Sequence, residues 1–545
     1  RAYYMNKGYF NTKSSYTIDT LKRKQRAEIN YNLSLGNPYK VSTFATEIIS
    51  PAIDSIYNLP KNKNKSLVKI GDQYNGNRFA QERKRLANIY LNSGVYNFQE
   101  SSIKFDVERD TIDTEKNGTK VLLKIDNLKI RGERNQKAKY KVYRFDSINI
   151  YTDYFFGDDI SKMNSIQYNN YNIYYKNKLR YKPKALVNAV FMEKDSVYRD
   201  KDRIDTYRRI SNLNTFKYPN IDFDSLGNRL NTKIYLSPLK KYQFIYEIAL
   251  THSNIQNIGV PFSTSVISRN VFGGAETLNV SARGSIGLLK SSAAGDGDFV
   301  SEIGADVNLT LPRLWLPFKT QKIVPYYMLP QTRMIIGTNF QKNIGLDKQN
   351  FNAILGYNWE QSSFKKSSLE LLNIQFVRNV NPERFFNVYQ NTYNRLDDIA
   401  SDYEDDPALA DLFETRGSST EPRLKIPDGT TGFTDQVINQ GLIPTNSNQY
   451  QVVRRIDERR ERLTENNLIF STNFSYTKDS RTDVNENSFH QYRIKIESAG
   501  NLLSAFSNVV DFNKDENADL TVFGVPFSQY IKTDFDYIKH WDIGR

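Results

Sequence analysis

Apolar and polar residues alternate strictly along much of the chain from about Lys241 onward. In the segment 242–250 every second side chain is aromatic or aliphatic: Tyr242, Phe244, Tyr246, Ile248 and Leu250. A period of two places such side chains on one face of a β-strand. The same alternation recurs in the segments 301–311, 370–377, 492–498 and 530–539. The pattern predicts about ten strands in this half of the chain.

The length of these strands distinguishes two kinds of β-protein. Alternation alone is also typical of soluble antiparallel sheets, whose strands have about 5 or 6 residues. The alternating segments run to about 9 to 12 residues, which is enough to cross a bilayer at a tilt of about 45°. Aromatic residues between two strands resemble the girdle at a membrane interface: Trp315, Phe318, Tyr326 and Tyr327. The pattern therefore predicts an antiparallel transmembrane β-barrel with one long outer loop, at about 380–466.

The first 239 residues follow a different pattern, in which helices and strands are mixed. An apolar stripe at helical spacing is formed by Phe79, Leu86, Ile89 and Tyr90. This helix is expected to stop at Gly94, and alternating runs at 101–110 and 119–128 predict a strand pair after it. Parts of the same unit recur at 3–41 and at 195–239. In the second of these, Ile204, Tyr207 and Leu213 are expected to form a buried helical stripe. A string of small α+β units is predicted.

Composition restricts the class of protein further. The chain has 13% aromatic residues, which disordered chains lack, so the 39% of hydrophobic residues are expected to be buried in folded units. There is no cysteine, so disulfides and thiolate metal sites are impossible. The formal charge of +14 fits nucleic acid, anionic lipid or an acidic partner equally well. No run of 18 apolar residues occurs, which excludes helical membrane spans.

The stretch "SRNVFGGAETLNVSARG", residues 268–284, contains a turn between two such strands. Gly273 and Gly274 are expected to supply the positive φ angles of this turn. In the strand after it, small apolar residues are expected to face lipid: Leu278, Val280 and Ala282. The residues between them are expected to face a wet lumen: Asn279, Ser281 and Arg283.

These features resemble a known family, the outer-membrane protein assembly factors that include BamA, TamA and the Bacteroidota protein TamL. The helix followed by "GYF" or "GVYNF" and a strand is similar to the POTRA domains of this family. The turn after the second barrel strand is similar to the family's turn at Asn270, Phe272, Gly273, Gly274 and Glu276. TamL-like proteins are the closest match we expect.

The resemblance implies a domain organisation. A partial POTRA domain is expected at 1–39, complete POTRA domains at 40–135 and 136–239, and the first part of an outer-membrane β-barrel at 240–545. The family barrel has sixteen strands, so about six further strands, a Val-Arg-Gly-Phe type motif and an N-terminal lipid anchor are expected outside this sequence. The expected location is the outer membrane of a Gram-negative bacterium, with the POTRA domains in the periplasm.

A search for catalytic and ligand-binding motifs predicts no catalytic residue, metal site or cofactor. His252, His490 and His540 lie far apart in the sequence and lack neighbours at metal-ligand spacing. The acidic run 397–406 lacks the spacing of a calcium loop and is expected to be a solvated loop helix. The basic run 454–462 is interleaved with acidic residues, which favours an exposed, salt-bridged segment over an anion site.

If the chain inserts proteins into the membrane, the working part is a strand edge. The first barrel strand, with its five residues from Tyr242 to Leu250, would pair with the last strand to close the barrel, and this weak seam would expose backbone groups to a client strand. The POTRA edge at Ile103, Phe105 and Val107 would guide unfolded chains or dock a partner. Expected partners are nascent outer-membrane proteins, a TamB-like or other assembly subunit and the bilayer, without nucleic acid.

Two other interpretations stay open, and a third is disfavoured. A transporter of the same superfamily that secretes one dedicated protein usually has two POTRA domains and a plug helix. A passive outer-membrane channel or receptor with a periplasmic extension would need no weak first strand. A soluble glycan-binding protein is disfavoured, because only three tryptophans are available for ligand platforms.

Overall fold

The computed structural model describes residues 2–21, 26–110, 117–130, 137–252, 256–289, 299–342, 346–415, 421–481, 486–506, 513–514, 520–522 and 525–542. They form two compact units, which are described separately. Unit 1 comprises Arg1–Ser211 and Phe216–Pro238, and unit 2 comprises Asn212–Thr215 and Leu239–Arg545. Among the described residues, no helix is both long enough and apolar enough to cross a membrane.

Unit 1 begins with a short helix and a hairpin, α1 (Ala2–Asn6), β1 (Lys13–Leu21) and β2 (Arg26–Ser34). A first complete α+β subunit follows: β3 (Lys40–Ile48), α2 (Pro51–Tyr57), α3 (Pro60–Lys63), α4 (Gly76–Leu91), β4 (Ile103–Arg109) and β5 (Gly118–Ile125). Its strand order is β3-β5-β4, with β3 parallel and β4 antiparallel to β5. The predicted strand pair after α4 is confirmed. The short strands β6 (Leu128–Lys129) and β7 (Lys137–Ala138) connect to the next subunit.

The helix α4 forms for reasons that are visible in the sequence. The Asn75 side chain caps its first turn by accepting a hydrogen bond from the Asn77 N–H. Phe79, Leu86 and Tyr90 are buried against the sheet, as the stripe predicted, while Ile89 packs at its margin. The chain then leaves the helix through Gly94, whose φ of 106° favours glycine.

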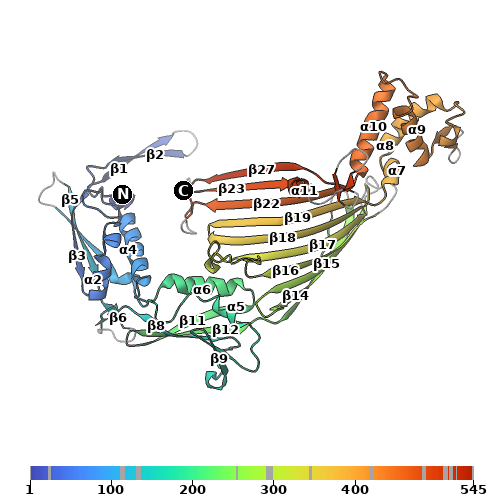
Figure 1. Ribbon diagram of the computed structural model, residues 1–545. Helices are drawn as coiled ribbons and strands as arrows, with labels where there is room; N and C mark the ends of the chain where they lie inside the picture. The colour runs from blue at the N-terminus through green and yellow to red at the C-terminus, as the bar shows by residue number, and fades with distance from the viewer. Residues whose placement is uncertain are drawn as a thin grey trace. The chain divides into compact units, whose positions relative to one another are not determined.

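A second α+β subunit has the same order of elements with one addition. It consists of β8 (Arg144–Tyr151), β9 (Asn164–Tyr168), β10 (Tyr171–Tyr175), α5 (Pro183–Val187), α6 (Asp200–Asn212), β11 (Phe216–Leu226) and β12 (Arg229–Pro238). The strand order is β11-β12-β8-β10-β9, and α5 and α6 lie along one face of this sheet (Figure 1). The added hairpin β9–β10 pairs along β8, so the outer edge of this strand is covered from within the subunit.

The predicted buried stripe on α6 is wrong at two of its three positions. Leu213 is buried, but Ile204 and Tyr207 are 44% and 43% exposed. The face that packs on the sheet carries mainly polar residues, among them Thr206 and Arg209. The Thr206 hydroxyl accepts a hydrogen bond from the Phe191 N–H at 2.9 Å, so this polar group is satisfied in the interior. Polar residues with local partners therefore occupy the positions where the pattern predicted apolar ones.

The connections into the two complete subunits share one arrangement. Gly8 and Gly94, both with positive φ, accept hydrogen bonds from the N–H groups of Tyr39 and Tyr143 at 2.9 Å each. The aromatic residue two positions after each glycine packs edge-on against the same tyrosine: Phe10 on Tyr39 at 5.2 Å and Tyr96 on Tyr143 at 4.9 Å between ring centroids. The repeated "GYF" and "GVYNF" stretches therefore form a repeated junction.

Unit 2 contains one ten-stranded antiparallel sheet in which sequential strands are neighbours (Figure 1). The strands are β13 (Tyr242–Ile248), β14 (Gln256–Arg269), β15 (Thr277–Leu289), β16 (Phe299–Leu311), β17 (Gln331–Lys342), β18 (Lys348–Ser362), β19 (Lys365–Asn379), β22 (Asn467–Asp479), β23 (Phe489–Ala499) and β27 (Tyr530–His540). The predicted number of strands is confirmed. Among the described residues, β13 and β27 each pair on one side only.

The two faces of this sheet differ as the alternation predicted. One face exposes large apolar side chains, including Val280 at 44%, Ile303 at 64% and Phe535 at 64%. The opposite face carries polar and charged groups that hydrogen-bond across strands, such as Asn339 with Glu302 at 2.9 Å. An exposed apolar face along ten strands is typical of a sheet that meets lipid on one side.

The long connection between β19 and β22 is folded. It contains α7 (Phe385–Val388), α8 (Gln390–Ala400), β20 (Phe413–Thr415), β21 (Pro422–Leu424), α9 (Asp428–Ile438) and α10 (Asn448–Thr464), which gather beyond one end of the sheet (Figure 1). We call these residues, 380–466, the helical insert. Its buried core includes Phe385, Leu396, Phe433 and Val453, together with Leu346 from the β17–β18 connection. The chain after β23 adds α11 (Asn501–Phe506), β24 (Asn513–Lys514), β25 (Leu520–Val522) and β26 (Val525–Pro526).

The two charged runs in the insert are only partly as expected. Asp397 on α8 is buried and accepts hydrogen bonds from the Leu424 N–H and the Arg423 side chain, so the acidic run is not solvated throughout. The basic run forms ion pairs along α10, Arg454 with Glu458 and Arg460 with Asp457, which confirms a salt-bridged segment.

Candidate functional site

The edge strand β13 exposes a row of backbone groups. Hydrogen bonds from Arg269 N–H to the Lys241 carbonyl, at 2.8 Å, and from Ala249 N–H to the Pro261 carbonyl, at 3.1 Å, fix which residues bond to β14. In an antiparallel pair these residues alternate, so the odd-numbered residues of β13 bond to β14. The N–H and C=O groups of the even-numbered residues therefore point to the open side of the strand: Tyr242, Phe244, Tyr246 and Ile248.

The side chains of the same residues lie on the apolar face. Their exposed fractions are 54% for Tyr242, 60% for Phe244, 75% for Tyr246 and 77% for Ile248, and Leu250 just beyond the strand is 79% exposed. The structure thus brings the five residues predicted for the seam onto one face of one edge strand. Their use by a client strand stays a prediction.

Pro261 weakens the pairing at the far end of β13. The residue pair Ala249 and Pro261 keeps the hydrogen bond to the Pro261 carbonyl, but proline has no N–H to return the second one. The regular strand ends at Ile248, directly before this pair, and an isolated bridge between Thr251 and Gly259 follows. Proline inside a strand is typical of sheet edges. Pro261 was not identified from the sequence, although this preference could have pointed to it.

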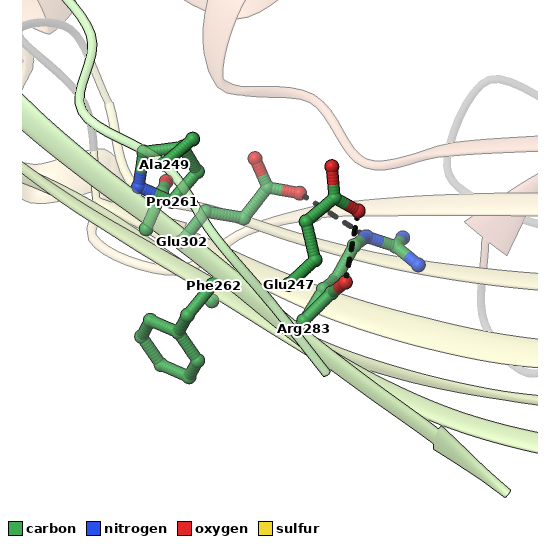
Figure 2. Close-up of a pocket in the computed structure, with 9 residues that line it drawn as sticks. Glu247, Ala249, Pro261, Phe262, Arg283 and Glu302 are labelled. Atoms are coloured by element: carbon green, nitrogen blue, oxygen red, sulfur yellow. Dashed lines mark hydrogen bonds and ion pairs between the residues drawn. The ribbon is translucent and has the colours of Figure 1, made fainter. Parts of the chain in front are cut away.

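A cavity of about 330 Å³ lies on the polar face beside β13, where Glu247, Arg283 and Glu302 converge from three strands (Figure 2). The Phe262 ring points to the opposite side of the sheet. There it covers its cross-strand partner Gly284, since a Cβ at Gly284 would lie 2.4 Å from the ring. The aromatic ring thus fills the space left by a glycine in the neighbouring strand.

The charged groups around this cavity are unequally paired. The Arg283 guanidinium donates to Asp306 and lies 3.9 Å from Glu302, and the cross-strand partner of Arg283 is Gly304, between these two acids. Glu302 also accepts from the Asn339 amide. Glu247, by contrast, is contacted by the Ser263 hydroxyl alone among the hydrogen bonds of the described residues, at 3.5 Å. The sequence pattern did not point to Glu247, because one polar residue in an alternating strand is ordinary.

The turn between β14 and β15 is built around a buried carboxylate. Glu276 is 1% exposed and accepts hydrogen bonds from the Gly274 N–H at 2.8 Å and the Phe272 N–H at 3.3 Å. Its other oxygen accepts from Arg313 at 3.0 Å. Burial by itself would raise the pKa of Glu276, but the backbone N–H groups and Arg313 outweigh it, so the pKa lies below its ordinary value of 4.5.

The expected role of the two glycines in this turn is half correct. Gly273 has a positive φ of 83°, but the other positive φ angles in the turn belong to Asn270 and Ala275. Gly274 is required for a different reason, because a Cβ there would lie 2.3 Å from a Glu276 carboxylate oxygen. Asn270 supports the turn by accepting a hydrogen bond from the Ala275 N–H at 3.0 Å. Thus Asn270, Gly273, Gly274 and Glu276 act together in one motif, while Phe272 is 55% exposed.

The predicted POTRA edge lies on β4, which is an edge strand of its sheet. Hydrogen bonds at both ends of the β4–β5 pair show that the even-numbered residues of β4 bond to β5. The backbone groups of Ile103, Phe105 and Val107 therefore point to the open side. Their side chains pack in the core, with Ile103 only 1% exposed, so the identities of these residues are explained by packing and their edge role stays a prediction.

Among the described residues, no group of three or more potential metal-ligating side chains converges. The His540 imidazole forms a hydrogen bond with the Asn487 carbonyl and stacks on Phe489. The edge of β13 offers strand pairing, and the turn contains the ion pair of Glu276 with Arg313.

No family model and no curated protein matches this sequence. Similar solved structures include BamA from Haemophilus ducreyi lacking POTRA domains 1–3, with 9% identity and a TM-score of 0.35, covering 85% of this chain and 64% of that one. BamA POTRA domains 3–5 from Haemophilus influenzae match at 11% identity and a TM-score of 0.22, covering 43% of this chain and 76% of that one. CdiB from Acinetobacter baumannii matches at 8% identity and a TM-score of 0.22, covering 85% of this chain and 68% of that one.

The order of architectures expected from the sequence is confirmed: α+β subunits precede a long antiparallel sheet. The TM-scores are below 0.5, so the fold is assigned from the strand orders described above. The comparison shows only that the chain is similar to BamA and CdiB. The expected resemblance to BamA-type proteins is in line with this likeness, and the resemblance to TamL stays a prediction. The chain spans slightly less than two thirds of the length of the BamA fragment.

Proposed function

We propose that this protein is an outer-membrane biogenesis factor that helps β-barrel or other surface proteins to fold and insert. The sheet of unit 2 would stand in the outer membrane with its apolar face toward lipid, and the POTRA-type subunits would lie in the periplasm. The observation that carries this proposal is the open edge of β13, whose even-numbered residues present both backbone groups and exposed apolar side chains outward.

An open edge in a membrane is energetically costly unless another strand pairs with it. Each unsatisfied N–H or C=O group in hydrocarbon costs several kcal/mol, so β13 strongly favours a partner strand, which in a closed barrel would be the last strand. A client strand that adds here exchanges one set of ladder hydrogen bonds for another, at little net cost. The missing N–H of Pro261 removes one hydrogen bond between β14 and the end of β13, so β14 holds that end of β13 less tightly.

The POTRA-type subunits supply a second place for strand addition in this proposal. The open side of β4 offers the backbone groups of Ile103, Phe105 and Val107, whereas the outer edge of β8 is covered by the β9–β10 hairpin. An unfolded client, or a periplasmic partner such as a TamB-like subunit, would add along β4. The domain boundaries at residues 39, 135 and 239 remain proposals with this function.

A single proline substitution in β13 tests the proposal. Tyr246→Pro removes one outward N–H without removing a hydrogen bond to β14, so the protein should still fold. Loss of one ladder bond of about 1 kcal/mol should slow client assembly about fivefold or more. The measurement is the rate at which an outer-membrane protein acquires its folded, heat-modifiable form in cells that depend on the variant.

Tyr246→Ala is the matched control, because it removes the same side chain and keeps the N–H. Normal assembly with Tyr246→Pro would contradict the seam mechanism and favour a passive channel. A defect confined to one secreted protein, with other barrels unaffected, would favour a dedicated transporter.

A further inference from the structure

The cavity beside β13 has an excess of negative charge. Three carboxylates lie on or next to it, Glu247, Glu302 and Asp306, against the single guanidinium of Arg283. Among the described residues, Arg283 forms its ion pairs with the two acids on β16 and none with Glu247. Glu247 therefore stands at the sheet edge with a hydroxyl at 3.5 Å as its partner among the described residues.

The position of Glu247 determines what can reach it. Glu247 is an odd-numbered residue of β13, so its backbone bonds to β14 and its side chain lies on the polar face. A strand that pairs antiparallel with β13 would face Glu247 in a non-hydrogen-bonded pair, in which Cα atoms are about 4.5 Å apart and side chains are closest. A Lys or Arg at that position of the incoming strand reaches both the carboxylate and the cavity, whereas an acidic residue would be repelled.

We propose that Glu247 selects incoming strands that carry a lysine or arginine at the position facing it. The proposal rests on the proposed function, since it assumes that client strands pair along β13. It names the chemistry of the partner: an extended amphipathic strand with one basic residue on its lumen-facing side. The alternating apolar residues of such a strand would continue the exposed face formed by Tyr242, Phe244 and Tyr246.

Two synthetic peptides test this selectivity on the full-length protein in phospholipid vesicles. Both are nine-residue amphipathic strands that differ only in the central lumen-facing residue, lysine in one and glutamine in the other. A photoreactive amino acid in place of Phe244 reports pairing along β13 through its crosslinking yield. The lysine peptide should half-saturate crosslinking at about fivefold lower concentration than the glutamine peptide, the ratio expected of a cross-strand ion pair.

Two substitutions locate the effect. Glu247→Gln should abolish the difference between the peptides, and Glu247→Lys should reverse it in favour of the glutamine peptide, because two lysines facing each other repel. Asp534→Asn removes a carboxylate on the same face of the other edge strand, β27, and should leave the difference unchanged. The fold of each variant is checked by its heat-modifiable mobility.

The outcomes separate this inference from the proposed function. Equal crosslinking of the lysine and glutamine peptides overturns selection by Glu247 and leaves strand pairing at β13 intact. No crosslinking of any peptide to a folded protein overturns both. A preference for lysine that survives Glu247→Gln also overturns the inference, because another group would then be responsible.

Discussion

At the residue scale, the turn between β14 and β15 was recognisable in the sequence, but the contacts that stabilise it were not. The sequence identified Asn270, Gly273, Gly274 and Glu276 by their resemblance to a family turn. It could not show that Glu276 is buried or that Arg313 pairs with it, because Arg313 lies 37 positions further along the chain. The requirement for glycine at position 274 is a clash with that same carboxylate, which is a tertiary effect that turn preferences do not contain.

Replacing Glu276 should destabilise unit 2 measurably. Glu276→Gln removes the charge that Arg313 and the turn N–H groups stabilise, and the expected cost is about 1–3 kcal/mol in the free energy of unfolding. Urea unfolding of the protein in detergent micelles measures it. Glu247→Gln, an exposed glutamate in the same sheet, is the control and should change stability by less than about 0.5 kcal/mol. Equal effects of the two substitutions would contradict the role assigned to Glu276.

The depressed pKa of Glu276 adds a dependence on pH. The folded-state pKa lies below 4.5, so the unfolded chain binds this proton first as the pH falls. The stability that Glu276 contributes is therefore fully present above about pH 5.5 and is lost as the pH falls through 4.5 and then through the folded value. The stability gap between the native protein and Glu276→Gln should shrink between pH 6 and pH 3. A gap that stays constant would show that the charge of Glu276 is unimportant.

At the scale of elements, periodicity predicted strands better than it predicted helical faces. The ten strands were recognisable because their side chains lie alternately on an exposed apolar face and on a polar face, and the sequence alternates in the same way. The buried face of α6 was missed because Thr206 and Arg209, rather than apolar residues, occupy it. The hairpin β9–β10 was missed as well, since nothing in a short strand pair indicates which sheet edge it will cover.

The repeated junction leads to a prediction about Gly94. A Cβ at this position would lie 2.5 Å from a Val142 methyl carbon, in a backbone conformation that already disfavours other residues. Gly94→Ala should therefore destabilise unit 1 by about 2–4 kcal/mol, combining backbone strain with the clash. The change in stability is measured by heating the whole protein and using limited proteolysis to detect the temperature at which unit 1 unfolds.

Gly157→Ala provides the matched control for the junction. Gly157 lies in the same unit and has a similar φ of 91°, but a Cβ there would have no neighbour within 4 Å. It should show the backbone cost of about 1 kcal/mol alone. If Gly94→Ala and Gly157→Ala are equally destabilising, the close packing at the junction contributes nothing.

At the scale of the whole molecule, the sequence predicted a succession of small α+β subunits and a long antiparallel sheet, and these are confirmed. It predicted a loop at 380–466, and the structure places a helical insert with its own core there. The difference arises because the insert buries residues such as Phe433 and Val453 between short helices, whose individual periodicity is too brief to recognise. The cavity beside β13 depends on pairing across four strands, which no local pattern encodes.

The central claim is that client strands pair with the open side of β13, and site-specific crosslinking tests it most directly. A cysteine at Phe244, paired with a cysteine in the first strand of an outer-membrane protein that is being assembled, should form a disulfide during assembly. A cysteine at Ile336, equally exposed on the apolar face but on the interior strand β17, should not. Absence of the Phe244 crosslink in a protein whose sheet is folded, or equal crosslinking at Ile336, would contradict the account.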